Sequence, residues 1–312
     1  MNFFIDMILT ALQQGLIYAV VAMGVYISYK ILDFPDLSVD STFPLGGVVS
    51  VGLIVGCGVN PVLAVLASFI AGCAAGAVTG VLHVKCKISK LLSGILVMTA
   101  LLSVTLAITK LITGSVSVII GYNNKTETLF NSGLAALFNS GSKTMINLGK
   151  TLVLLIVVLF VKILMDLFFK TKTGFMLKAS GDNEQLVVSL GQDVGIYKIL
   201  GLSLANGLVA LAGSVYSQNY NYYDNQSGVG MVVIALASVI IGSAIFRKSR
   251  IVKGTTAVII GALIYSACLS LAVNIGINTI YLKLVMAVIF TVVLILNNFA
   301  ASGAEKSRMK RR

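Results

Sequence analysis

The sequence predicts an all-α integral membrane protein with about nine transmembrane helices, and three observations lead to this class. First, 57% of the 312 residues are hydrophobic and only 11% are charged, against roughly a quarter charged in an ordinary soluble domain. Second, the apolar residues form long continuous runs and not the alternating pattern of a membrane β-barrel. Third, the backbone must satisfy its hydrogen bonds internally in a bilayer, so continuous apolar runs indicate helices.

Nine stretches approach the roughly 20 mostly apolar residues that a spanning helix needs. They are residues 7–29, 42–59, 61–82, 91–112, 146–169, 196–217, 228–246, 254–274 and 280–299. An interruption near residues 33–50 widens the expected count to eight to ten. We therefore expect one transmembrane domain over residues 1–300, followed by a basic tail over residues 301–312.

The basic residues indicate the orientation. Seventeen of the 23 Lys and Arg residues are Lys30 or lie in residues 85–90, 170–198, 247–253 and the tail. A nine-span alternation places all of them on one side, which the positive-inside rule assigns to the cytoplasm. The C-terminus is then cytoplasmic and the N-terminus outside, unless the interruption changes the parity. Topology and the lipid bilayer account for the net charge of +12, and no nucleic-acid partner is expected.

Residues 30–47 interrupt the helical pattern. Asp33, Asp36 and Asp40 lie here with Pro35 and Pro44, so we expect a broken helix. Irregular backbone at membrane depth occurs where it lines a cavity or is buried in protein, which makes Asp36 and Asp40 candidates for a translocation path. The alternative is a cytoplasmic turn with capping aspartates.

The outer segment 113–145 mixes turn residues with short apolar patches. We expect a loop with a short interfacial helix, on which an extracellular partner could dock. A solvated loop without a partner fits equally well.

Gly72, Gly76 and Gly80 recur at four-residue spacing in the third stretch. Small residues at this spacing let two membrane helices approach closely, so we expect a packing face here.

The sequence offers no catalytic or metal site. His83 is the only histidine and has no carboxylate or cysteine at ligand spacing, and the four cysteines form no C-x-x-C pair. Residues 242–249, GSAIFRKS, approach a phosphate-binding loop but have Arg247 where its second glycine is needed. We therefore expect no enzymatic activity and no bound cofactor.

Few ionisable residues lie deep in the predicted spans. Lys162 and Asp166 are one helical turn apart and can pair. Ion-coupled carriers commonly keep carboxylates or histidines near the midplane, so uphill transport would take its energy from another subunit. A self-sufficient ion-coupled secondary transporter or channel remains the alternative.

The cytoplasmic segment 170–195 predicts a short amphipathic helix. Its parts are a turn at Gly181, Asp182 and Asn183, a helix from Glu184 to Leu190, and a closing Gly191. Leu186, Val187 and Leu190 would form an apolar patch, which is suited to a groove on another protein.

This segment resembles the coupling region of ABC-importer permeases of the branched-chain amino-acid and ribose type, with the pattern G-x-N-E-x-A-A-x-x-x-G-I. The matching residues are Gly181-Asp182-Asn183-Glu184-Gln185, Leu190-Gly191 and Gly195-Ile196. Leu186 and Val187 replace the two alanines. The stretches 15–19, 32–40 and 46–47 look like the opening of the same family, in a branch linked to aromatic amino-acid uptake.

The resemblance implies the permease subunit of an ATP-driven importer in a bacterial plasma membrane. The implied solute is a small molecule, and an aromatic or branched-chain amino acid fits the resemblance best. An extracellular binding protein would deliver it. The implied partners are a second permease copy and a cytoplasmic ABC ATPase, which would hold ATP and Mg²⁺. The residues implied to contact the ATPase are Asp182, Asn183, Glu184, Gln185, Leu186, Leu190 and Gly191.

Candidates for contact with solute are Asn206 and the polar run from Ser217 to Gln226. Tyrosines 216, 220, 222 and 223 could stack on an aromatic solute or contact the binding protein. An interfacial aromatic belt is the alternative. The path residues singled out are Asp36, Asp40, Asn206 and Tyr220.

Overall fold

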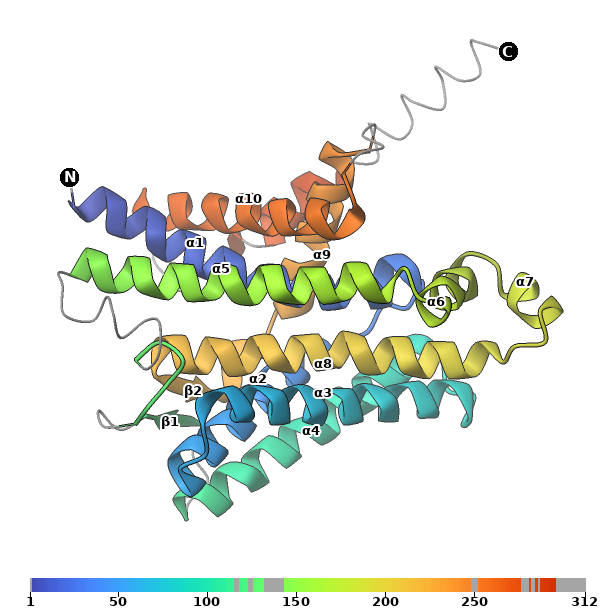
Figure 1. Ribbon diagram of the computed structural model, residues 1–312, viewed down its shortest axis with the longest axis horizontal. Helices are drawn as coiled ribbons and strands as arrows, with labels where there is room; N and C mark the ends of the chain where they lie inside the picture. The colour runs from blue at the N-terminus through green and yellow to red at the C-terminus, as the bar shows by residue number, and fades with distance from the viewer. Residues whose placement is uncertain are drawn as a thin grey trace, which may run out of the picture.

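The computed structural model is an elongated bundle whose long helices run along its longest axis (Figure 1). It describes residues 2–114, 118–122, 126–131, 143–247, 252–275, 281, 284–285 and 287–295. Eight helices within these ranges are long and apolar enough to cross a membrane, which confirms the predicted class. The ninth predicted stretch, 280–299, lies partly outside the described residues, and the tail lies entirely outside them.

The elements follow one another with short connections. They are α1 (Asn2–Val25), the π-helix η1 (Tyr26–Ile31), α2 (Val39–Val51), the π-helix η2 (Gly52–Gly56), α3 (Pro61–Val84), α4 (Lys90–Thr113), β1 (Ile119–Gly121), α5 (Lys143–Phe168), α6 (Lys172–Asp182), α7 (Glu184–Ser189), α8 (Val194–Tyr220), β2 (Tyr222–Asp224), the 3-10 helix η4 (Asn225–Gly228), α9 (Met231–Ile245) and α10 (Gly254–Asn274).

The bundle has two distinct ends, seen at the left and right of Figure 1. The hairpin end carries the start of α1 and the antiparallel pair β1–β2, in which Ile119 faces Asp224. The basic end carries α6, α7 and the turn between α3 and α4, with Lys85 and Lys87.

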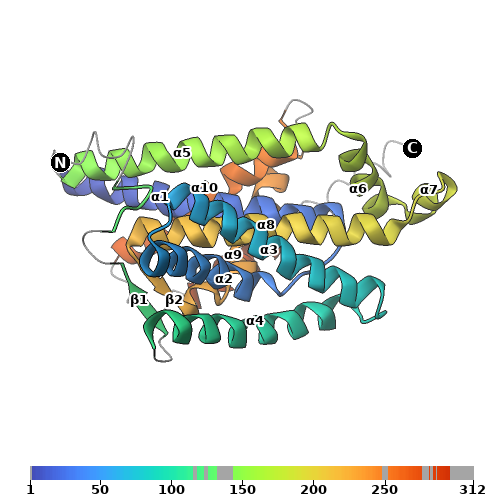
Figure 2. The same ribbon diagram turned by 60° about the horizontal axis from the view of Figure 1, so that its bottom comes forward.

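The interruption near residues 33–50 does not change the alternation of spans. α1 and η1 run to the basic end, where Asp33 accepts a hydrogen bond from Lys90 Nζ at 2.7 Å through its backbone oxygen. The chain then turns back into the bundle, and α2 runs toward the hairpin end. The start of α1 therefore lies at the opposite end of the molecule from α7 (Figures 1 and 2).

Local sequence explains where several helices begin and end. Asn60 caps α3 by accepting from Val62 N at 2.9 Å, and Pro61 takes the first helical position, where no amide is needed. α4 ends at Gly114, whose φ of 74° is left-handed and suits glycine.

α8 lies centrally and packs against α3, α2 and α1. A side chain at Gly72, Gly76 or Gly80 would overlap α8, so the predicted packing face of α3 is confirmed. The opposing residues on α8 are Ile199, Leu202, Asn206 and Ala210.

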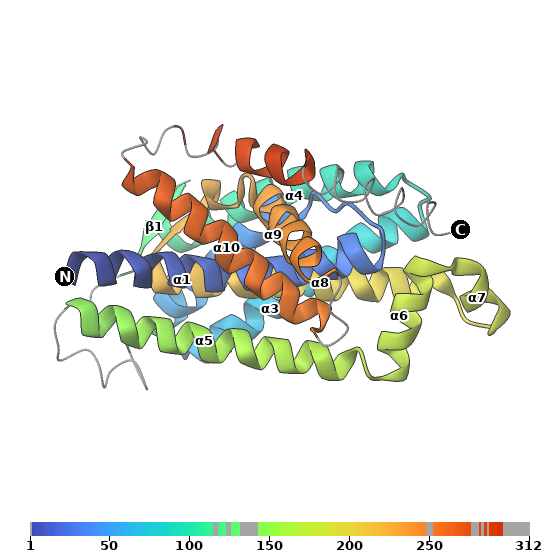
Figure 3. The same ribbon diagram turned by 90° about the horizontal axis from the view of Figure 1, so that it is seen from above.

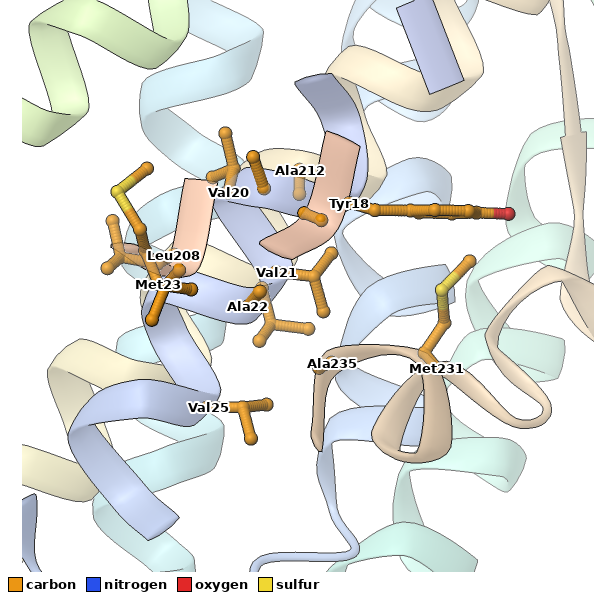
Figure 4. Close-up of a cluster of buried hydrophobic side chains, with 14 of the residues drawn as sticks. Tyr18, Val20, Val21, Ala22, Met23, Val25, Leu208, Ala212, Met231 and Ala235 are labelled. Carbon is orange, nitrogen blue, oxygen red and sulfur yellow. The ribbon is translucent and has the colours of Figure 1, made fainter. Parts of the chain in front are cut away.

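The hydrophobic core surrounds the second half of α1. Figure 4 shows its side chains with Leu208 and Ala212 of α8 and Met231 and Ala235 of α9. α4 and α5 bury much less of their surface and present exposed leucines, isoleucines and other apolar residues, as helices in contact with lipid do.

Three features differ from the sequence-based expectations. The segment before α7 forms a further helix, α6, and Gly181 lies inside it, where a side chain would overlap the Ile31 carbonyl of η1. The outer segment 113–145, in which a short interfacial helix is expected, contributes the strand β1. Its residues 115–117, 123–125 and 132–142 lie outside the described residues.

Candidate functional site

Asp36 lies between α1 and α2, level with the middle of α8. Its Oδ2 accepts a hydrogen bond from Asn206 Nδ2 at 2.7 Å. Its Oδ1 accepts from Ser38 N at 2.9 Å and lies 2.6 Å from the Ser38 hydroxyl. The Thr79 hydroxyl of α3 lies 3.5 Å from that of Ser38, and all four residues are buried. These donors replace the water that a buried carboxylate loses, so the cluster fixes the broken segment onto α8 and α3.

Asp40, in the first turn of α2, caps α9. Its Oδ2 accepts from Gly230 N at 3.1 Å and its Oδ1 from Val232 N at 2.9 Å. Gly230, at the N-cap position, has a left-handed φ of 91° and offers no side chain of its own. The carboxylate therefore satisfies amides at the start of α9 and lies at the positive end of the helix dipole.

A second irregular segment, residues 221–230, packs against α2 next to Pro44. Because proline has no N–H, Pro44 cannot donate the usual helical hydrogen bond to the Asp40 carbonyl four residues before it. Gly228 packs against this carbonyl, and a side chain there would overlap both Asp40 and Pro44. The stretch 221–230, entering from the hairpin end, thus meets the first turns of α2, which directly follow the stretch 32–38 entering from the basic end.

We call the place where they meet the mid-membrane junction (residues 36–40 and 228–232). α2 starts here and runs toward the hairpin end, whereas α9 starts here and runs toward the basic end. Discontinuous helices that begin near the bilayer midplane are typical of the solute sites of transporters. Irregular backbone is tolerated at this depth because the protein buries it.

Three tyrosines gather nearer the hairpin end. The rings of Tyr216 and Tyr220 lie 4.6 Å apart between centroids, and Tyr222 lies 6.5 and 6.2 Å from them. Phe43 of α2 contacts Tyr216 edge-on at 5.4 Å. Tyr223 is not part of this tyrosine cluster, because it is buried and donates to Asn225 Oδ1 at 2.9 Å.

Gln218 closes the bundle at the hairpin end and was not singled out individually from the sequence. It is fully buried, donates to Ser50 Oγ at 3.0 Å and accepts from Leu129 N at 3.1 Å. It therefore links α8 to α2 and to the outer segment. The burial of Gln218 has no signal in the sequence, because a glutamine within the polar run from Ser217 to Gln226 is expected to face solvent.

α7 extends from the basic end beyond the rest of the bundle (Figure 1). Asn183 caps it by accepting from Leu186 N at 3.2 Å, and Gly191 follows it with a left-handed φ of 70°. Glu184 pairs with Lys198 of α8 at 2.6 Å. The predicted short helix is thus present and anchored at its start.

The exposed face of α7 differs from the predicted one at a single position. Leu186 and Leu190 are 46% and 52% exposed, as expected, but Val187 is fully buried. Val188, at 63% exposure, takes its place on the surface. Since successive helix positions differ by about 100°, the buried Val187 anchors the short helix while its neighbours face outward.

The predicted pair of Lys162 and Asp166 on α5 is confirmed at 3.2 Å. Asp166 also accepts from Lys253 Nζ at 2.9 Å and from the Thr255 hydroxyl at 2.7 Å. α5 is thereby tied to the start of α10 at the basic end.

Within the described ranges, no three His, Cys, Asp or Glu residues gather as a metal site would require. His83 instead places Nδ1 2.8 Å from the Ile88 backbone oxygen and packs edge-on against Phe34. The four cysteines are free.

The eight membrane helices of the described ranges and the mid-membrane junction define a polytopic membrane protein built like a transporter. The model of the family described as branched-chain amino acid transport system, permease component, matches residues 7–296. The chain belongs to this family. It is a transport component rather than an enzyme, and a permease component acts with other parts of its transport system.

The chain is similar over nearly its whole length to curated permeases. It is 40% identical to the tyrosine transport system permease protein of Clostridioides difficile strain R20291, covering 95% of this chain and 92% of that protein. It is 30% identical to the ribose import permease protein RbsC of Escherichia coli K12, over 95% of this chain and 87% of that protein. No solved structure gives a significant match.

Proposed function

We propose that this chain is the membrane-spanning permease subunit of an ATP-driven ABC importer, and that its solute is an amino acid, aromatic or branched-chain. The family description and the likeness to a tyrosine transport permease support the solute class. In this proposal an extracellular binding protein delivers the solute, and two copies of the chain form the membrane part. The basic end faces the cytoplasm of a bacterial cell, and in this proposal the C-terminus is cytoplasmic too.

The observation that carries the proposal is α7. It stands away from the bundle with Leu186, Val188 and Leu190 exposed, at the end where the basic residues gather. Exposed apolar residues on a short anchored helix suit a groove on a partner protein. That partner is the ATPase, which holds ATP and Mg²⁺, while this chain binds neither.

The residues proposed for the ATPase contact divide into two groups. Leu186 and Leu190 make the apolar contact, whereas Asn183 and Glu184 hold the helix in place through the cap and the ion pair with Lys198. The other members of the contact are Asp182, Gln185 and Gly191.

The proposed path leads from the hairpin end past Tyr220 to the mid-membrane junction. Asp36, Asp40 and Asn206 set the geometry at that depth. Asp36 and Asn206 are buried with their polar groups engaged, so opening the path requires the segment before α2 to move away from α8.

Co-purification tests the proposal. A tagged permease is expected to retain the ATPase in detergent, and Leu186→Lys/Leu190→Lys is expected to release it without lowering the melting temperature, because both side chains are exposed. Cys86→Lys is the matched control, since it adds charge at an exposed position of the same end, outside α7.

Retention of the ATPase by the double variant at wild-type level would contradict the assignment of α7. Sodium- or proton-driven accumulation of solute by the chain alone would favour the secondary transporter instead.

A further inference from the structure

A cavity of about 270 Å³ opens at the basic end, where three membrane helices and α6 come together. The residues lining it are Tyr26, Asp166, Phe169, Lys170, Lys178, Lys253, Gly254 and Thr255. They belong to η1, the end of α5, α6 and the start of α10. Figure 3 shows the start of α10 beside the end of α5, next to α6.

The cavity is positively charged. Lys170, Lys178 and Lys253 line it and are all exposed. Its one carboxylate, Asp166, is already engaged by Lys162, Lys253 and Thr255, with 12% of its side chain exposed. In the part of the chain that the structure describes, neither Lys170 nor Lys178 forms an ion pair.

Two further features suit an anion. α10 begins at the cavity with Lys253 at its N-cap, which supplies no side-chain cap, so the positive end of the helix dipole faces this region. Phe169 holds Lys178 in place, because the Lys178 Nζ lies 4.6 Å from the centre of its ring.

The cavity opens beside a lipid-facing surface. Leu155, Leu159 and Ile163 follow the same face of α5 as Asp166, at helical spacing, and they are 41–55% exposed. Lys170 follows two residues after α5 ends. A molecule held in the cavity by a phosphate group can therefore lay acyl chains along α5. A soluble anion would gain nothing from this apolar surface.

We propose that this cavity binds the phosphate headgroup of an anionic phospholipid in the leaflet at the basic end. Basic pockets between membrane helices are suited to such headgroups. The bound headgroup links the corner between α5 and α6 to the start of α10, and so braces the segment that leads to α7. The inference depends on the membrane placement of the spans and not on which solute is carried.

The test compares lipid retention by two double variants of the full chain. Lys170→Gln/Lys178→Gln removes two charges from the cavity and leaves the Asp166 ion pairs intact. Lys85→Gln/Lys87→Gln removes two exposed charges from the same end, outside the cavity. Native mass spectrometry of the protein in detergent counts the phosphatidylglycerol molecules that each variant retains and compares this number with the phosphatidylcholine molecules retained.

The cavity variant is expected to weaken phosphatidylglycerol retention about tenfold or more, since each lysine near a lipid surface contributes about 1 kcal/mol. The control variant should retain the lipid as the wild type does. An equal loss in both variants would show general surface attraction and overturn the site.

A second arm separates the lipid from a free anion. Phosphatidylglycerol should raise the melting temperature of the wild type, and inorganic phosphate at the same concentration should not. Equal protection by phosphate would overturn the lipid assignment. Neither arm depends on solute uptake, so the outcome is independent of the proposed transport function.

Discussion

Asp36 is the residue on which the broken segment depends. It receives hydrogen bonds from Ser38 and Asn206 on both of its oxygens and has almost no contact with solvent. A charge in such a place is retained because fixed donors surround it, and losing one of them leaves a buried polar group unsatisfied.

Asp36→Asn is expected to destabilise the protein by about 1–3 kcal/mol and to reduce uptake, because an amide nitrogen then faces a donor. The combined variant Asp36→Asn/Asn206→Asp restores a donor and an acceptor between the two positions, so it should recover part of the loss. Thermal unfolding in detergent measures the stability of the single and double variants, and a transport assay measures their uptake. A double variant no better than the worse single variant would contradict the pairing.

At the scale of elements, close backbone contacts hold the helices together. Gly46 of α2 packs against the Ala210 carbonyl of α8, and Gly213 of α8 packs against the Phe43 carbonyl of α2. A methyl group at either glycine would overlap main-chain atoms, which cannot swing aside as the end of a side chain can.

Gly46→Ala should therefore lower the yield of monodisperse protein in size-exclusion chromatography and its melting temperature, with a cost of about 1–3 kcal/mol or more from overpacking. Gly56→Ala is the matched control, because no atom lies within 4 Å of the position of its added carbon. Equal behaviour of the two variants would show that α2 and α8 are not packed as described.

The spans could be predicted from sequence because their apolar runs carry the information locally. The break at residues 33–50 was also predictable, since Pro35, Pro44 and the aspartates disfavour a continuous helix. The capping of α9 by Asp40 could not be predicted from the sequence. Its partners at the start of α9 lie about 190 positions away, and no local pattern specifies such a contact.

Two errors have the same kind of cause. Gly181 was interpreted as a turn residue, but its lack of a side chain serves contact with Ile31 inside α6. Val187 was expected on the exposed face of α7, but it is buried there. In both places tertiary packing, and not local propensity, determines the residue's surroundings.

At the scale of the whole molecule, two native cysteines report the orientation. Cys57 is exposed just after η2 on the hairpin side, and Cys86 is exposed in the turn between α3 and α4 at the basic end. In variants that keep only one of them, a membrane-impermeant maleimide should label Cys57 on intact cells and Cys86 only after permeabilisation. The reverse pattern would contradict a cytoplasmic basic end.

We propose that this chain forms the path for the solute but does not supply the energy for its transport. The most direct test of this claim is uptake of labelled tyrosine into proteoliposomes that contain the chain, the ATPase and the binding protein. We predict accumulation that requires all three proteins and ATP on the side of the basic end. Accumulation by the chain alone, driven by a sodium or proton gradient and indifferent to ATP, would contradict the claim.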